Sequence, residues 1–161
     1  AKLTEMLARK KESTQLIMAR IIAKPSESAY DALIIDGGID VGMRVGAKVY
    51  ARGDMLIGTV IEADQHASKI KLLSTSAEVT KAVIVGKDIF IDLEGQGGGT
   101  FQTTLPRDVV IEKGTTVATV DSGETIAITE ESLADPRDPF QRILFRSPIN
   151  VFELRFVGVE K

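Results

Sequence analysis

Few residues of this chain could carry out chemistry. His66 is the one histidine and cysteine is absent, so a serine–histidine–aspartate triad would have to use His66, and thiol catalysis is excluded. His66 lies in a polar stretch, residues 63–68 (ADQHAS), between two apolar runs, where an exposed turn histidine is the simpler interpretation. The sequence has no Gly-x-Ser-x-Gly motif of the kind that hydrolases use. We therefore predict a protein without catalytic residues.

Carboxylates and clustered glycines offer little more. Asp135 and Asp138 fall in residues 134–139 (ADPRDP), where Asp-Pro turns explain them without paired-carboxylate catalysis. Residues 97–99 (GGG) lack the Lys-Ser/Thr of a phosphate loop and precede no helical pattern. They indicate a flexible hinge or a close crossing of strands. One histidine and no cysteine do not favour a metal site, so we expect no metal and no cofactor.

The composition is that of a folded, mostly acidic protein. Of 161 residues, 43% are hydrophobic and 27% are charged, which allows a core to form. Residues 1–24 hold six basic and two acidic side chains, so the rest of the chain is acidic at an overall net charge of −3. An acidic body argues against nucleic-acid binding. No apolar run of about 18 residues is present, so we expect any membrane attachment to use a segment preceding Ala1.

Beyond Pro25 the apolar residues recur with a period of two, which is typical of half-buried strands. We predict strands over residues 29–36, 47–51, 55–63, 69–74, 82–93, 101–105, 115–120, 124–129, 142–146 and 151–159. Residues 130–135 predict one short helical turn. The pattern as a whole predicts a mainly β fold of two small, six-stranded-type β-barrel modules, residues 25–93 and 94–161, between which strands can be exchanged.

Residues 1–24 are expected to form an α-helix that precedes the barrels. Leu3, Met6, Leu7 and Ile17 fall on one stripe of that helix, although polar residues interrupt its middle. A short helix packed on its own domain and the end of a coiled coil both fit this pattern. We predict the coiled-coil end, with these four residues as a self-association surface.

The most informative stretch is a series of glycines between residues 34 and 63. The predicted structural turn glycines are Gly37, Gly38, Gly42, Gly46 and Gly58. Charged residues interleaved with them exclude helix packing in a membrane. Because glycine reaches positive φ without steric cost, the series predicts a corner of a small barrel. A weak internal repeat supports two related modules, since residues 44–49 (RVGAKV) are similar to residues 112–117 (EKGTTV).

The order of these motifs resembles the periplasmic region of the rod shape-determining protein MreC family. The matching motifs are Ile-Asp-Gly-Gly, Asp-Val-Gly-Met, Val-Gly and Leu-Ile-Gly-x-Val-Ile, at residues 35–38, 40–43, 45–46 and 56–61. The resemblance is good over residues 21–74 and vaguer afterwards. Many members carry a longer glycine-rich loop where residues 120–124 run directly into the next strand, a departure that concerns any partner contact made through that loop.

The resemblance implies a non-enzymatic periplasmic scaffold of the bacterial cell-elongation machinery, anchored in the inner membrane. It also implies self-association into a homodimer or a higher assembly, and binding to peptidoglycan-synthesis proteins. The implied partners are a class B penicillin-binding protein, MreD and, indirectly, the MreB filament. Open modules would offer strand edges for pairing, with residues 82–93 and 151–159 as candidates. The alternative is a periplasmic adaptor subunit of an export system, which also joins helices to small barrels.

Overall fold

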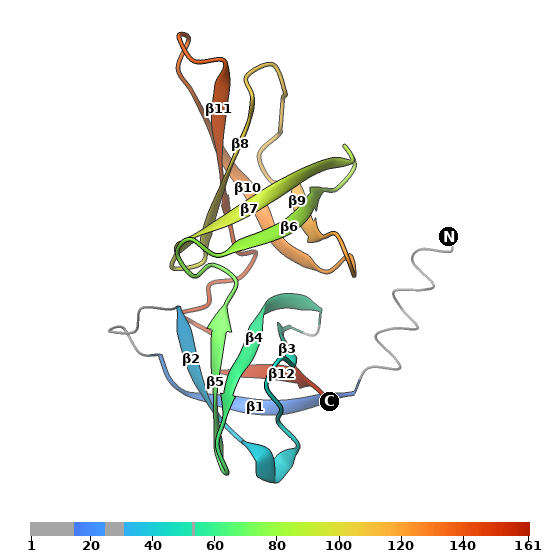
Figure 1. Ribbon diagram of the computed structural model, residues 1–161, viewed down its shortest axis with the longest axis vertical. Helices are drawn as coiled ribbons and strands as arrows, with labels where there is room; N and C mark the ends of the chain where they lie inside the picture. Colours follow the sequence, from blue (N-terminus) through green and yellow to red (C-terminus); the bar gives the residue numbers. More distant parts are fainter. Residues whose placement is uncertain (1–14, 25–30, 53) are drawn as a thin grey trace. The chain divides into compact units, whose positions relative to one another are not determined.

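The computed structural model describes residues 15–24, 31–52 and 54–161. In this part the chain forms two closed barrels of six strands each, built from antiparallel strand pairs (Figure 1). The prediction of a mainly β protein with two six-stranded modules is confirmed.

The first barrel has the strand order β1-β12-β3-β4-β5-β2. Its strands are β1 (Leu16–Ala23), β2 (Ala32–Asp36), β3 (Lys48–Ala51), β4 (Met55–Ala63), β5 (Ala67–Leu72) and β12 (Phe156–Glu160). Burial alternates along β5, as expected for a strand with one face on a core. Branched aliphatic side chains fill the interior, and the fully buried ones are Ile35, Val49, Val60, Ile70, Val157 and Val159.

The second barrel has the strand order β10-β11-β8-β7-β6-β9. Its strands are β6 (Val79–Ile84), β7 (Ile89–Gly97), β8 (Thr100–Pro106), β9 (Thr116–Thr119), β10 (Thr125–Ala134) and β11 (Phe140–Arg146). Its largest fully buried side chains include one aromatic ring, and they are Ile84, Leu93, Val117, Thr129, Ile143 and Phe145.

The predicted module boundary between Leu93 and Glu94 is wrong, because it falls inside β7. Residues 82–93 form no single strand; they cover parts of β6 and β7, which are joined by a turn at Gly86 with φ +88°. Both strands belong to the second barrel, whereas β12, near the end of the chain, belongs to the first. Pairing between strands far apart in sequence does not affect local periodicity, so the sequence pattern could not show that β12 belongs to the first barrel.

The predicted helix over residues 1–24 is wrong where the structure describes it, since Leu16–Ala23 form strand β1. Ile17 pairs with Val159 of β12 and is half-buried in the first barrel, so it is not part of a helical stripe. Pairing with strands on both sides outweighs the weak helical preference of an interrupted stripe. Leu3, Met6 and Leu7 lie outside the described residues.

Two further predictions are wrong. Residues 130–135 form no helical turn, because β10 continues to Ala134. The edge-pairing candidates, residues 82–93 and 151–159, were expected to belong to open modules, whereas β6, β7 and β12 each have a strand neighbour on both sides in a closed barrel. Closing a barrel removes the edges that an open sheet would expose.

Candidate functional site

Gly37 and Gly38 lie where β2 leads into a short 3-10 helix, Ile39–Val41. The N–H of Gly37 donates to the carbonyl oxygen of His66 at 2.9 Å, which ties this turn to the β4–β5 hairpin. A Cβ atom on Gly38 would lie 1.9 Å from the carbonyl oxygen of Asp64. Only glycine permits that approach of two backbones, so the role of Gly38 is steric.

Gly42 and Gly46 both adopt φ +92° in the turns that follow, a conformation that other residues reach only with strain. Gly46 donates its N–H to the carbonyl oxygen of Val60 at 2.8 Å. Gly58 is different, because it lies inside β4, opposite Val49 and beside a register shift. Its predicted role as a turn glycine is therefore wrong, and it belongs to a strand irregularity.

His66 contacts a carboxylate at the tip of the first barrel. Its Nδ1 lies 2.9 Å from Oδ2 of Asp40, and the imidazole is 79% exposed. The hydrogen bond from His66, and a second from the N–H of Gly38 at 3.0 Å, hold the pKa of Asp40 below its usual value. Among the described residues no serine is hydrogen-bonded to His66, so the His66–Asp40 pair stabilises the turn and forms no triad there.

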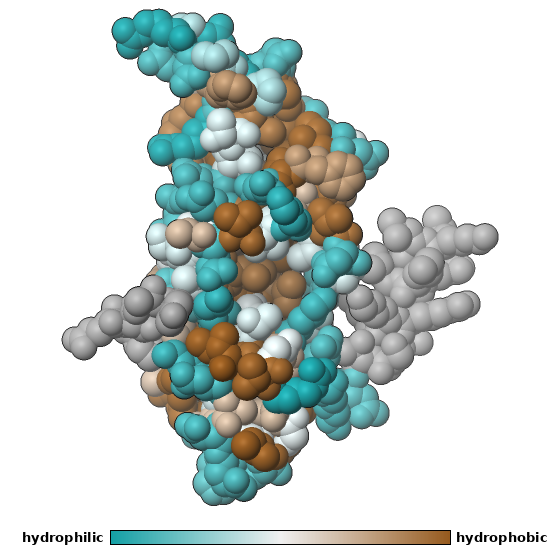
Figure 2. Space-filling model, in the orientation of Figure 1, coloured by the Kyte–Doolittle hydropathy of each residue, from teal (hydrophilic) through white to brown (hydrophobic). Residues whose placement is uncertain are grey.

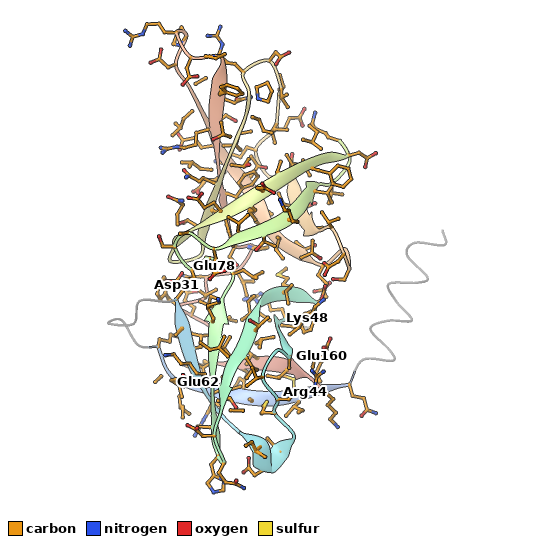
Figure 3. The ribbon with its side chains drawn as sticks, in the orientation of Figure 1. Asp31, Arg44, Lys48, Glu62, Glu78 and Glu160 are labelled. Atoms are coloured by element: carbon orange, nitrogen blue, oxygen red, sulfur yellow. The ribbon has the colours of Figure 1, made fainter. Side chains whose placement is uncertain are left out.

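The three glycines at residues 97–99 form the turn between β7 and β8, with φ values of +89°, +63° and +82°. The N–H of Gly98 donates to the carboxylate of Asp31 at 2.7 Å, and the hydroxyl of Ser74 donates to the same oxygen at 2.8 Å. The N–H of Gly99 donates to Oγ of Ser74 at 3.0 Å. The anion held by this loop is thus the chain's own Asp31, which is labelled in Figure 3, and the loop is a hairpin turn within the second barrel.

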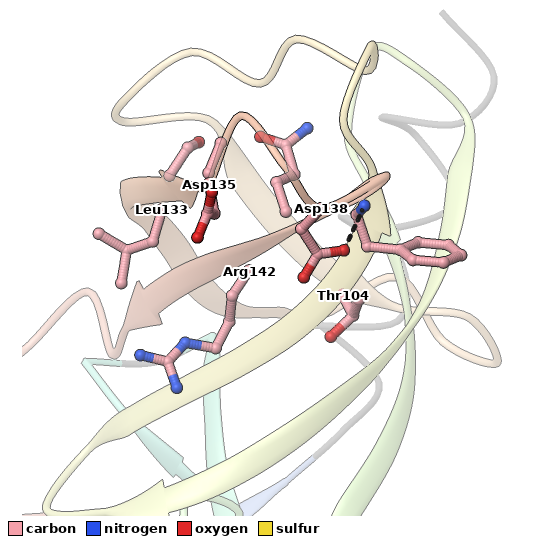
Figure 4. A pocket seen from close by; sticks show the side chains of 9 residues that line it. Thr104, Leu133, Asp135, Asp138 and Arg142 are labelled. Carbon is pink, nitrogen blue, oxygen red and sulfur yellow. Dashed lines mark hydrogen bonds between the residues drawn. The ribbon is translucent and has the colours of Figure 1, made fainter.

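The hairpin of β10 and β11 carries a shallow groove of about 560 Å³ near its tip (Figure 4). Thr104, Leu133 and Arg142 contribute to its lining. The two aspartates of the tip have structural partners. Asp135 accepts a hydrogen bond from the N–H of Arg137 at 2.9 Å, which lowers the pKa of Asp135.

Asp138 accepts the N–H of Phe140 at 2.9 Å, drawn as a dashed line in Figure 4. Such Asx contacts stabilise turns. They account for both tip carboxylates without acid–base chemistry.

Four of the six phenylalanines are exposed, which sequence reasoning missed. Phe90 is 70% exposed, Phe152 66%, Phe156 57% and Phe140 52%. Figure 2 shows hydrophobic areas at several places on the surface in this view. Exposed aromatic rings are typical of protein-binding surfaces. The sequence holds only a weak indication that these rings are exposed. Phe140 follows a proline-rich turn, and Phe156 is adjacent to the buried Val157, so the alternation of a strand puts the two side chains on opposite faces.

Within residues 15–24, 31–52 and 54–161, no group of three or more His, Cys, Asp or Glu side chains could hold a metal ion. In the same part of the chain, no helix is long and apolar enough to cross a membrane.

Comparison with known proteins places the chain in a family. Residues 21–161 match the family model described as rod shape-determining protein MreC, barrel core. A sequence search of curated proteins gives no match.

Several solved structures share the fold. One, described as MreC, is 18% identical with a TM-score of 0.81, and the match covers 100% of both chains. MreC from Pseudomonas aeruginosa is 16% identical with a TM-score of 0.80, covering 90% of this chain and 98% of that one. A complex between penicillin-binding protein PBP2 and MreC from Helicobacter pylori contains a chain that is 10% identical, with a TM-score of 0.55, covering 91% of this chain and 99% of that one.

The family match spans both barrels and includes the glycine turns at residues 37–46. It favours the cell-shape prediction over the export-adaptor alternative. The chain belongs to the rod shape-determining protein MreC family.

Proposed function

We propose that this chain is the periplasmic, non-enzymatic part of a cell-elongation scaffold that binds a class B penicillin-binding protein. The observation that carries the proposal is the family match over residues 21–161. It is supported by the Helicobacter pylori complex, in which a protein of the same fold is bound to PBP2.

The surface of the barrels suits such a role. Exposed phenylalanines lie on both barrels, for example Phe156 on the first and Phe90 on the second. Large aromatic side chains contribute much of the free energy of protein–protein binding when a partner covers them. The proposal extends to MreD and MreB as further partners, to self-association, and to attachment to the inner membrane through a separate segment.

Binding to the class B penicillin-binding protein of the same bacterium tests the proposal. The immobilised enzyme should bind the purified chain with a Kd of about 10 μM or lower, measured by biolayer interferometry, while a penicillin-binding protein of another class should bind more weakly.

Two matched variants sharpen this test. Gly95→Val distorts the second barrel, because a Cβ atom there would lie 2.2 Å from the carbonyl oxygen of Thr75. Gly86→Asn is the control, because Gly86 faces open space at φ +88°, a conformation that asparagine tolerates. Binding that survives the control substitution supports the proposal, and the absence of binding by the wild-type chain would contradict it. The effect of Gly95→Val then reports whether the second barrel takes part.

A further inference from the structure

The last part of β10 has a strand neighbour on one side only. β9 pairs with β10 between Thr125 and Ile128, whereas β11 pairs with it as far as Ala134. Residues 130–134, which we call the edge segment, are all exposed. Alternate residues of an antiparallel strand direct their N–H and C=O groups to opposite sides. Part of the edge segment's backbone therefore points away from β11, where no described strand receives it.

The groove near the tip lies beside this edge. Leu133 stands opposite Arg142 in the ladder, and Arg142 stands opposite Thr104 of β8. These three residues share one face of the three strands, and all three line the groove. Leu133 is 38% exposed and Phe140, also lining the groove, is 52% exposed. A strand added to the edge would place every second side chain on this same face.

The charge on the edge selects the kind of partner. Residues 130–135 carry three carboxylates, from Glu130, Glu131 and Asp135, and no cation. Within the described residues neither Glu130 nor Glu131 forms an ion pair, whereas Asp135 already pairs with Arg137. The arginines of the hairpin lie off the edge strand, as with Arg142 on β11. Two copies of the edge would bring glutamates together, which disfavours self-pairing and favours a basic segment.

We propose that the edge segment accepts an extended, lysine- or arginine-containing segment of a partner protein as an added β-strand, with an apolar side chain of that segment beside Leu133 in the groove. Main-chain hydrogen bonds along the edge would supply affinity, and the glutamates and the groove would supply selectivity. The inference rests on the proposed scaffold function, because it assumes a protein partner.

A peptide titration followed by NMR tests this inference. The probe is an acetylated and amidated peptide of about six residues that alternates lysine with valine. At peptide concentrations on the order of 1 mM, amide signals of residues 130–134 should shift and alternate amides should exchange more slowly with solvent. Two control peptides should leave these signals in place: one with proline at the centre, which removes a strand N–H, and one with glutamate replacing lysine.

Charge variants on the protein complete the test. Glu130→Lys with Glu131→Lys should weaken binding of the lysine peptide at least about tenfold and leave the melting temperature unchanged. The matched double variant Glu112→Lys with Glu153→Lys alters two exposed carboxylates of the same barrel, and it should bind like the wild type.

Three outcomes would overturn the inference. The first is the absence of shifts at residues 130–134 with the lysine peptide. The second is equal binding of the glutamate peptide. The third is a concentration-dependent shift of these signals without peptide, which would show pairing with a second copy. Each outcome is distinguishable from failure of the proposed function, because binding to the penicillin-binding protein is measured separately on the unmodified chain.

Discussion

The two barrels repeat one arrangement of strands. Around the first barrel the order β3-β4-β5-β2-β1-β12 corresponds to β9-β10-β11-β8-β7-β6 around the second. The chain passes through equivalent strands in the same sequence, except that the equivalent of β6 comes last, as β12. A single module has thus been used twice, and the end of the chain completes the first copy. This is why no cut along the sequence separates the barrels.

Two glycine turns, one in each barrel, have the same backbone structure. Gly46 has φ +92° and donates to the carbonyl oxygen of Val60 at 2.8 Å, while Gly114 has φ +87° and donates to the carbonyl oxygen of Thr129 at 2.8 Å. Figure 3 labels Arg44, which begins the first of these turns and bonds Glu160 of β12 at 3.5 Å. The weak repeat of residues 44–49 and 112–117 therefore corresponds to a shared backbone structure.

The barrels differ in one hairpin. A backbone N–H just after β2 donates to the carbonyl oxygen of His66, and one just after β8 donates to that of Pro139, both at 2.9 Å. These two bonds mark equivalent points just before the second strand of each hairpin. Val60 and Thr129, which accept the hydrogen bonds of Gly46 and Gly114, mark equivalent points on the first strand. His66 follows Val60 by six positions, whereas Pro139 follows Thr129 by ten, so the second hairpin is four residues longer. The longer hairpin extends β10 beyond its pairing with β9 and carries the groove. The repeated core thus supports the fold, and a local extension adds a surface.

The largest expected effect comes from the close backbone crossings, one in each barrel. Added Cβ atoms would lie 1.9 Å from a carbonyl oxygen at Gly38 and 2.2 Å at Gly95. Gly38→Ala and Gly95→Ala should each lower the free energy of unfolding by about 3 kcal/mol or more, measured by chemical denaturation. Gly86→Asn, in open space, should cost little. A wild-type midpoint for Gly38→Ala or Gly95→Ala would show that the crossings are not required.

Equivalent turns should respond equally. Gly46→Val and Gly114→Val each place a branched side chain at positive φ with no atom within 4 Å, so the cost is backbone strain alone. We expect a loss of about 1–3 kcal/mol for each, with the two values within about 0.5 kcal/mol of each other. Unequal values from denaturation curves would break the comparison between the barrels.

One expected effect belongs to the second barrel alone. Asp31→Ala removes the acceptor for the N–H of Gly98 and the hydroxyl of Ser74, and Ser74 is 3% exposed. The loss should be about 1–2 kcal/mol in thermal unfolding. Asp31→Asn, which keeps an oxygen acceptor, should lose less. Equal losses for alanine and asparagine would mean that the carboxylate position is not used as an acceptor.

The smallest effect belongs to the first barrel and depends on pH. Hydrogen bonds from His66 and Gly38 lower the pKa of Asp40 from 3.8, so its ionised form stabilises the fold above that value and the stabilisation is lost as the pH falls through the lowered pKa. Asp40→Asn should therefore melt below the wild type at neutral pH, and the gap should close on acidification. Asp64→Asn, at an exposed neighbouring carboxylate, is the control. A gap that persists in acid would contradict this account.

Local signals made part of this fold predictable. The strand over Met55–Ala63 has the bounds that the apolar pattern predicted, because local apolar residues such as Leu56 and Val60 are the ones that become buried. The strand Leu16–Ala23 was not predictable, because its stability comes from β12, more than a hundred residues away. Residues 130–134 resemble a helical turn in composition, and only their pairing with β11 holds them extended.

The candidate site likewise has a part that the sequence predicts and a part that it does not. Gly37 and Gly42 could be placed from turn chemistry, which is local. The pairing of Asp31 with Gly98 could not, because it joins residues 67 positions apart.

Depletion of this protein in its own bacterium is the decisive test of a role in cell elongation. If the protein is a cell-elongation scaffold, microscopy should show rod-shaped cells becoming wide and rounded within a few generations, and re-expression should restore the rods. Unchanged cell width and length after depletion would contradict the account.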